Sequence, residues 1–418
     1  MPMVKIERFK EMFRQINEYG YTGEGMNRLA YSKEEAQALQ YIKRLCEAEG
    51  LLYRQDEIGN VIIRREGTDP SLPAVAVGSH IDTVYNGGMY DGTVGVLAGL
   101  EVLFALNEEK VRTTHPLEVI IFACEESARF GLATVGSKAM VGTLDLEEVM
   151  RLHDKSDQTF TEVIAQKGFS LEYISMAERN EDELKAFLEL HIEQGPVLEE
   201  IGKDIGLVTG IAAPTRYHVT IHGRQSHSGS TPMRSRQDAL LAASEFALYL
   251  EQLALEEEDA KTVATVGACK VKSGAMNIVP GEVKLHVDIR SIYMESKERL
   301  IEKLHVFVKQ LEKKRGVQVT FRKITNETPV LLNEKLLELA KSGCEKRNFT
   351  YEEMPSGAGH DAMNMALKYP TGVIFIPSKD GLSHHPDEYT SFKQIEKGIH
   401  LLKDILCELA IFPELYKL

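Results

Sequence analysis

The chain has 418 residues, of which 43% are hydrophobic and 27% are charged, and its 49 Lys and Arg against 63 Asp and Glu give a net charge of 49 − 63 = −14. This composition is typical of a globular protein long enough for two or three domains, and it excludes disordered and fibrous chains. The acidic excess argues against nucleic acid or an anionic membrane as the partner. We therefore expect a small molecule or another protein as the partner.

The amino-terminal segment MPMVKIERFKEMF lacks the apolar core of a signal peptide, and no apolar run of about 18 residues occurs in the sequence. The five cysteines form no C-x-x-C pair. This pattern favours reduced thiols over disulfides or a cysteine-based zinc site. We expect a soluble, cytoplasmic protein.

The first half of the chain alternates predicted helices with buried strands. Helical spacing of apolar residues predicts helices over 33–49 and 92–108. Apolar runs predict strands over 51–55, 60–65, 74–80, 117–126 and 186–195. Strand, helix and strand in this order predict a mostly parallel sheet flanked by helices, and ligands gather at the carboxyl edge of such a sheet.

After about residue 212 the pattern changes. The predicted elements are a strand over 216–223, a helix over 238–258, strands over 263–274 and 282–291, a helix near 295–313 and a strand over 317–323. This β-α-β-β-α-β order is typical of a compact α+β unit. A helix, a strand over 372–378 and a carboxyl-terminal helix follow. We predict an α/β domain formed by 1–211 and 329–418, interrupted by a smaller α+β domain over 212–328.

Side chains that can bind metal lie in five segments at, or just after, the ends of predicted strands. They are His80 with Asp82, Asp91, Glu125 with Glu126, His191, and His384 or His385. A single His at a strand end is more often structural than a ligand. The Glu125–Glu126 pair is stronger evidence for a metal site, because burying carboxylates is costly unless a cation compensates them. Such ligands suit zinc, manganese or cobalt, and a bridging carboxylate such as Asp91 can hold two ions.

Seven motifs carry a resemblance over nearly the whole chain. They are GSHIDTV with YDGTVGV, FACEESARFG, LELHIEQGPVLE, HSGSTPM, MNIVPG with VDIRS, SGAGHDA, and FIPSKDGLSHHPDE. In this order they resemble the dinuclear-metal amidohydrolases and exopeptidases. Within that family they are most similar to the branch of N-carbamoyl-L-amino acid hydrolases, allantoate amidohydrolases and β-ureidopropionases.

The resemblance implies two divalent metal ions per subunit, manganese, cobalt or zinc, with Asp91 as the bridge. The implied ligands are His80, Asp91, Glu126, His191 and His384. Because His385 stands beside His384, the choice between them stays open. Asp82 lies two residues beyond His80 on the same strand face, so it can accept the imidazole N–H and fix the tautomer.

The resemblance also implies the remaining machinery. Glu125 is the implied general base, and His227 is the implied stabiliser of the oxyanion, contributed by the second subunit of a homodimer. The expected substrate contacts are Gln194, Asn277, Arg290 and Gly359. The interrupting domain over 212–328 is then a lid and dimerisation domain, and the remainder is the catalytic domain. Ser228, Ser230 and the KSGAMN loop depart from the common pattern near the expected substrate.

The favoured function is metal-dependent hydrolysis of N-carbamoyl-L-amino acids to the L-amino acid, ammonia and carbon dioxide. Allantoate hydrolysis is the main alternative, because it needs the same metals, base and carboxylate-binding Arg. An N-acyl-amino acid hydrolase or a dipeptidase is a weaker alternative. A non-catalytic binding protein is the weakest, since the base and all five ligand positions are present.

Overall fold

The computed structural model describes residues 3–258 and 261–412, which form two compact units. The first unit comprises the residues up to Thr209, Leu332–Met354 and those from His360 on. The second comprises Gly210–Leu331 and Pro355–Gly359. The first unit is therefore built from both ends of the chain. The predicted fold, an α/β part interrupted by a smaller α+β part, is confirmed, while the catalytic and lid roles of the two parts stay predictions.

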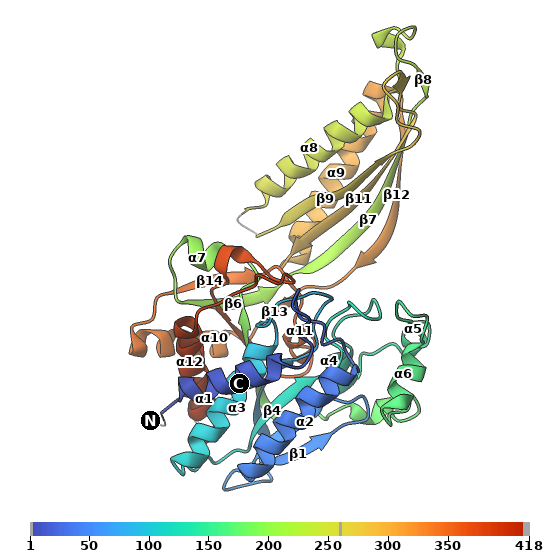
Figure 1. The fold of residues 1–418 in the computed structure, drawn as a ribbon. Coiled ribbons are helices and arrows are strands. Elements are labelled where there is room, and N and C mark those ends of the chain that lie inside the picture. Colours follow the sequence, from blue (N-terminus) through green and yellow to red (C-terminus); the bar gives the residue numbers. More distant parts are fainter. Residues whose placement is uncertain (1–2, 259–260, 413–418) are drawn as a thin grey trace. The chain divides into compact units, whose positions relative to one another are not determined.

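A mixed sheet organises the first unit (Figure 1). In the described residues its strands are β1 (Leu52–Gln55), β2 (Val61–Arg65), β3 (Ala74–His80), β4 (Leu117–Phe122), β5 (Leu184–Ile192), β6 (Ile205–Ile211), β13 (Val330–Leu331), β14 (Tyr351–Ser356) and β15 (Thr371–Ile376). Strand β13 and the last residues of β6 and β14 fall among the residues of the second unit. The order is β1-β2-β4-β3-β5-β15-β6-β13, with β14 beside β6. The central strands β4, β3, β5 and β15 are parallel, whereas the margins are antiparallel. The carboxyl ends of the central strands therefore meet at one edge.

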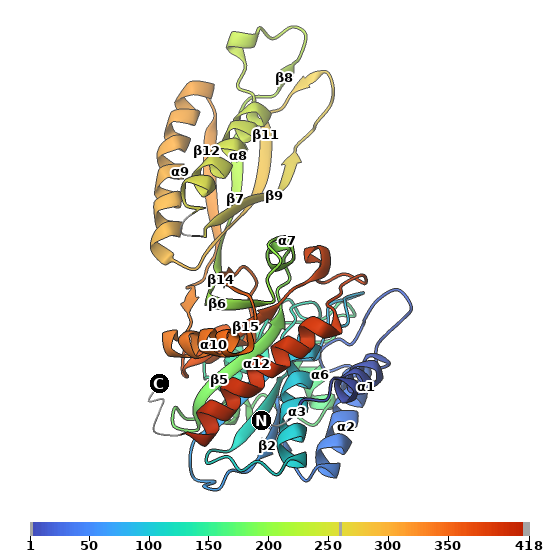
Figure 2. The same cartoon turned by 90° about the vertical axis from the view of Figure 1, so that its left-hand side faces the viewer.

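Helices cover the first unit's sheet. They are α1 (Ile6–Asn17), α2 (Lys33–Ala48), α3 (Thr93–Glu108), α4 (Val135–Met140), α5 (Leu146–Val149), α6 (Phe160–Gln166), α7 (Val197–Glu200), α10 (Glu334–Arg347), α11 (Asp361–Met365) and α12 (Phe392–Ile411). Figure 2 shows α3 and α12 side by side over the strands. The following elements have no counterpart among the predicted ones: helices α1, α4, α5, α6, α7 and α11 and strands β6, β13 and β14.

Helix α3 is apolar on all sides because it is buried on all sides, with every residue from Thr93 to Leu106 inaccessible. It packs on β3 and β5 and is covered by α1 and α12. At Gly95 an added Cβ would come 2.3 Å from the Leu190 carbonyl oxygen, so glycine lets the helix approach the sheet. This packing holds the amino-terminal end of α3 at the carboxyl edge of the sheet.

The second unit has two helices on one face of a four-stranded antiparallel sheet (Figure 1). The strand order is β12 (Gln318–Asn326), β7 (Ala213–His222), β11 (Glu282–Ser291) and β9 (Val263–Val271). Helices α8 (Ala239–Glu256) and α9 (Met294–Arg315) bury the alternate apolar residues of these strands. A separate ribbon pairs β8 (Ser226–His227) with β10 (Ile278–Val279). No helix in the described residues is long and apolar enough to cross a membrane.

Candidate metal centre

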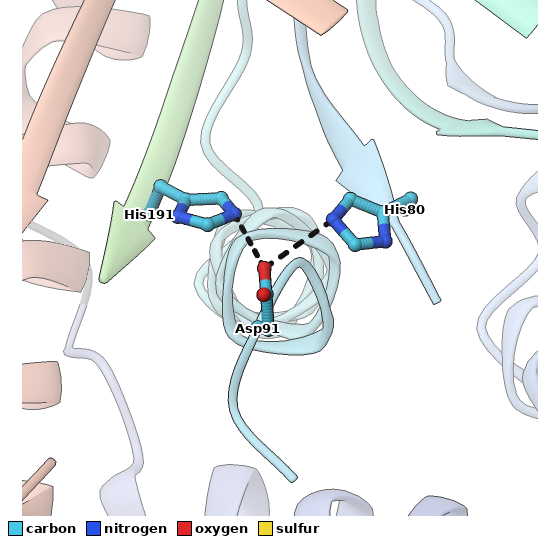
Figure 3. Close-up of side chains that lie close together, drawn as sticks. All are labelled: His80, Asp91 and His191. Carbon is cyan, nitrogen blue, oxygen red and sulfur yellow. Dashed lines mark ion pairs between the residues drawn. The ribbon is translucent and has the colours of Figure 1, made fainter. Parts of the chain in front are cut away.

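The ends of two neighbouring parallel strands bring His80 and His191 together. His80 is the last residue of β3, and His191 lies one residue before the end of β5. Asp91 lies just before α3, and the buried position of this helix places Asp91 at the same carboxyl edge of the sheet. Figure 3 shows its carboxylate between the two imidazoles, with Asp91 Oδ1 3.5 Å from His80 Nε2 and 3.0 Å from His191 Nε2.

The other oxygen of Asp91 faces a second set of ligands. Asp91 Oδ2 lies 3.1 Å from His384 Nε2, and the same nitrogen lies 3.1 Å from Glu126 Oε1. The structure thus gathers His80, Asp91 and His191 in one group that could hold a cation, and Asp91, Glu126 and His384 in another. Asp91 belongs to both groups, which is the arrangement that a bridging carboxylate requires.

Backbone carbonyl groups select the tautomer of both buried histidines. His80 Nδ1 lies 2.9 Å from the carbonyl oxygen of Asp82, and His191 Nδ1 lies 2.9 Å from that of Ile192. Since a carbonyl oxygen only accepts, each Nδ1 carries the proton. Once Nε2 has lost its proton, its lone pair faces Asp91 in each neutral ring and is available to a metal ion.

The charges of the site favour cations. Burial opposes ionisation of Asp91, but hydrogen bonds from His191, His384 and His80 hold its pKa well below the ordinary value. Burial also opposes the charged form of His80, yet Glu125, Asp91 and Asp82 raise its pKa well above the usual range. Buried carboxylates in this number need compensating positive charge. The donor set, of imidazole and carboxylate, fits two divalent ions such as zinc, manganese or cobalt.

The structure distinguishes the two adjacent histidines at the end of the motif. His384 adopts a positive φ of 55°, which turns its ring toward Asp91 and Glu126. His385 is exposed, and its Nδ1 accepts the backbone N–H of Asp387. Only His384 belongs to a group of potential ligands. Its side chain is 50% exposed, so this side of the site is open to solvent.

Three polar residues support Asp91. Glu388 Oε1 accepts the backbone N–H groups of Tyr90 and Asp91 at 2.8 and 3.1 Å. Ser383 Oγ lies 3.2 Å from Asp91 Oδ2 and 3.1 Å from Glu388 Oε2. Gln194, predicted as a substrate contact, donates from Nε2 to Asp91 Oδ2 at 2.9 Å, and its own Oε1 is buried without a partner. Sequence reasoning assigned no role to Glu388 or Ser383, although both lie in the quoted FIPSKDGLSHHPDE motif.

Asp82 acts in two ways. Its main-chain carbonyl, rather than its carboxylate, accepts the His80 Nδ1–H, because Oδ1 is 3.7 Å from that nitrogen. The carboxylate instead accepts the backbone N–H groups of Glu125 at 3.2 Å and Glu126 at 3.0 Å. Asp82 therefore holds the turn that carries both glutamates.

The Asp82→Asn variant should bind divalent metal about 10- to 100-fold more weakly, because an amide can accept with only one of its two terminal atoms. One of the two glutamate N–H groups would then face an NH₂ group. Competition with a fluorescent chelator measures the affinity. Asp69→Asn, at an exposed turn whose carboxylate accepts the Ser71 N–H, is the matched control. An Asp82→Asn affinity equal to that of the control would contradict the positioning role.

The second unit holds His227, Asn277, Arg290 and Gly359. The β8–β10 ribbon brings His227 and Asn277 close together, and the Asn277 carbonyl accepts the Ser228 N–H at 2.9 Å. His227 Nδ1 accepts the N–H groups of Gly229 and Ser230 at 3.1 and 3.2 Å. The proton of the neutral ring is therefore on Nε2, which leaves an exposed hydrogen-bond donor.

Arg290 is held in place by its neighbours. Its Nε and Nη2 donate to the two carboxylate oxygens of Asp288 at 3.2 and 3.1 Å, and its Nη1 donates to the Gly357 carbonyl at 2.8 Å. Gly359 follows in the same loop. A guanidinium group has five N–H donors, so these contacts leave two free at its outer end. That end can bind a carboxylate with two parallel hydrogen bonds.

Comparisons with known proteins agree on one group of enzymes. The model of peptidase family M20/M25/M40 matches residues 76–408. The N-carbamoyl-L-amino-acid amidohydrolase of Paenarthrobacter aurescens is 38% identical, covering 96% of this chain and 97% of the relative. The ureidoglycolate hydrolase of Arabidopsis thaliana is 38% identical, covering 92% of this chain and 82% of the relative. The allantoate amidohydrolase of Bacillus subtilis is 35% identical, covering 94% and 95%.

A solved structure agrees with these relatives. The hydantoinase/carbamoylase family amidase of Burkholderia multivorans superposes with a TM-score of 0.92 at 32% identity. The match covers 97% of this chain and 98% of that one. Fold and sequence similarity therefore extend over both units.

Proposed function

The chain belongs to peptidase family M20/M25/M40 and is a hydrolase of carbon–nitrogen bonds of the hydantoinase/carbamoylase type, and from this premise we propose that it hydrolyses N-carbamoyl-L-amino acids. The products are the L-amino acid, ammonia and carbon dioxide. The observation that carries the proposal is the position of Asp91. It belongs to two groups of potential ligands, and the Glu125 carboxylate lies 3.7 Å from His80 Nε2 in one of them. The relative from Paenarthrobacter aurescens, whose name states this activity, supports the choice of substrate.

Five residues would hold two divalent ions in this proposal, with Asp91 between them. One ion would be bound by His80 and His191, and the other by Glu126 and His384. Bound there, the cations would activate a water molecule and polarise the carbonyl of the carbamoyl group. Asp82, Ser383 and Glu388 keep the ligands in place.

Glu125 would move the proton. Its carboxylate takes a proton from the attacking water and returns it to the departing nitrogen. Burial raises the pKa of Glu125 well above its ordinary value, His80 opposes that rise, and the carboxylates of Glu126 and Asp361 add to it. A base with a raised pKa accepts a proton more readily, and the positive charge of bound cations would offset part of this rise.

The second unit would bind the rest of the substrate. The free end of the Arg290 guanidinium group suits the amino acid carboxylate, and Asn277 and the Gly359 backbone would contact the same molecule. The Nε2–H of His227 would donate to the oxyanion that forms on the carbamoyl carbon. Gln194, whose buried Oε1 lacks a partner, would accept an N–H of the carbamoyl group.

Allantoate is the second candidate substrate, and ureidoglycolate is a third, because relatives named for each activity match nearly the whole chain. The deciding experiment offers N-carbamoyl-L-methionine, allantoate, ureidoglycolate and N-acetyl-L-methionine to metal-stripped protein reloaded with manganese, cobalt or zinc. Metal-dependent release of methionine from the carbamoyl compound alone is the expected result. Turnover of allantoate or ureidoglycolate alone would replace the proposed substrate, and turnover of none would overturn the proposal.

The protein is further proposed to act as a homodimer in the cytoplasm. On α8, Leu241, Leu248 and Leu255 are 41%, 66% and 65% exposed, and their seven-residue spacing places them on one face of the helix. Beside α8, β9 is an edge strand of the sheet, and its Val263 is exposed. A second copy of the chain would cover this apolar face and strand edge. All five cysteines are free, which supports a reducing compartment.

The Leu248→Glu variant should elute as a monomer in size-exclusion chromatography with light scattering, because its carboxylate would be buried in the proposed interface. If His227 serves the partner's active site, kcat should fall together with the dimer fraction. Leu367→Glu, at a comparably exposed leucine of the first unit (60%), is the control and should remain dimeric. A dimeric Leu248→Glu protein would exclude this face as the interface.

A further inference from the structure

A pocket of about 420 Å³ lies in the first unit, outside the groups of potential metal ligands. Its wall includes Ser32 and Lys33 at the beginning of α2, Tyr85 after β3, the turn over 154–158, and the end of α6. A volume of this size is within the range of small-molecule sites. The proposed amidohydrolase reaction uses none of the residues that line it.

The pocket is strongly cationic. Lys33, Arg129, Lys155 and Lys167 line it together with a single carboxylate, Asp154, which gives 4 − 1 = +3 in a chain of net charge −14. The Asp154 carboxylate is already engaged. Its Oδ2 accepts two N–H groups of Arg129 at 3.2 and 3.1 Å, and its Oδ1 accepts the N–H groups of Ser156 and Gln158.

Two of the three lysines contact neutral groups. Lys155 Nζ lies 3.5 Å from the centre of the Tyr85 ring, and Lys167 Nζ donates to the Ser32 carbonyl at 3.1 Å. Within the ranges that the structure describes, the ion pairs include none of the three lysines, whereas Lys341 and Lys314, for example, are paired with glutamates. The ammonium groups that line this pocket repel one another, and a bound anion would relieve that repulsion.

The backbone at the beginning of α2 adds a partial positive charge, although its first turn also carries the carboxylates of Glu34 and Glu35, which do not line the pocket. Helix α2 has 16 residues and begins after Ser32, whose side chain accepts the Glu35 N–H. The first N–H groups of a helix carry a partial positive charge that favours phosphate and carboxylate. Lysine side chains bind phosphate as point charges, and three of them line the same pocket as this helix start.

We propose that this pocket binds a small organic phosphate monoester at a site separate from the metal centre. The phosphate group would lie among Lys33, Lys155 and Lys167, and the volume leaves room for the organic part of the molecule. Two wall residues are linked to the metal centre through the chain, since Tyr85 follows Asp82 and Arg129 follows Glu126 by three residues each. Arg129 Nη1 also donates to the Ala30 carbonyl at 2.6 Å, so bound phosphate would stabilise the joined segments.

Isothermal titration of the metal-loaded full chain with glycerol 3-phosphate tests the proposal. The Lys155→Gln/Lys167→Gln variant should bind at least about tenfold more weakly than the unsubstituted protein. Lys309→Gln/Lys313→Gln removes two exposed lysines of the second unit that make no ion pair among the described residues, and it is the control of equal charge. Circular dichroism and melting without ligand check that both variants are folded.

Inorganic phosphate and succinate are the comparison probes. Phosphate should bind more weakly than glycerol 3-phosphate but at the same lysines, and succinate should not compete. Equal affinity of the two double variants for glycerol 3-phosphate would overturn the proposal. Binding at the metal centre alone would give this result. So would a dissociation constant above about 1 mM for both phosphate probes. Binding of succinate but of neither phosphate would overturn the class of ligand.

Discussion

Glu125→Gln is expected to lower kcat by about a thousandfold while the protein stays folded and retains its metal. Glutamine has the shape of glutamate but cannot take up a proton from water and return it to the leaving nitrogen. The Glu125 carboxylate lies 3.7 Å from His80 Nε2, yet Glu125 is in neither group of potential ligands that shares Asp91. Its replacement should therefore affect the reaction without emptying the metal site.

Single-turnover kinetics and metal analysis on the same sample check this result. The neighbouring variant Glu126→Gln is the matched control, since it alters a proposed ligand and should lose metal as well as activity. The two adjacent residues thus predict different outcomes. A Glu125→Gln enzyme with kcat within about tenfold of the unsubstituted enzyme would remove Glu125 as the base.

Gly92→Ala should weaken metal binding at least about tenfold, although Gly92 offers no ligand atom. An added Cβ would stand 2.4 Å from His80 Nε2 and 2.5 Å from Cδ2. The ring of His80 would have to move, and Gly92 is backed by the buried helix α3. Its φ of 62° and ψ of −46° add backbone strain of about 1–3 kcal/mol for a residue with a Cβ.

The Gly50→Ala variant is the control that distinguishes backbone strain from the contact of the added Cβ with His80. Gly50 has a similar φ of 68°, but nothing lies within 4 Å of an added Cβ. This control should lose about 1 kcal/mol of stability in urea unfolding and keep its metal affinity. Equal metal affinities in the two alanine variants would show that the contact with His80 does not position the ligand.

The metal-binding side chains at the ends of short apolar strands could be predicted from the local sequence pattern. The strands ending at His80 and at His191 are short, apolar runs, and parallel neighbours bring their ends together. Asp91 and the Glu125–Glu126 pair could be predicted as metal-site residues because they too are carboxylates that come after predicted strands. The carbonyl groups that select the His80 and His191 tautomers were not, because any strand end offers carbonyl oxygens.

The support of Asp91 by Glu388 and Ser383 could not be predicted, because nearly 300 residues separate these partners. The motif resemblance implied His384 rather than His385, but the positive φ of His384 that accompanies this choice in the structure was not indicated by any local pattern. The antiparallel margins of the first sheet also escaped prediction. Strand β13 has only two residues, and β14 mixes exposed and buried residues, so their periodicity is weaker than that of the central strands.

The first unit's construction from both ends of the chain has a consequence for biosynthesis. Four of the five proposed ligands lie before residue 192, but His384 and strand β15 follow the inserted second unit. Since β15 is a central strand between β5 and β6, a nascent chain that has emerged only as far as the inserted unit lacks the middle of its sheet. The ribosome must therefore release nearly the whole polypeptide before Asp91, Glu126 and His384 can come together, so this group of potential ligands is completed late in biosynthesis.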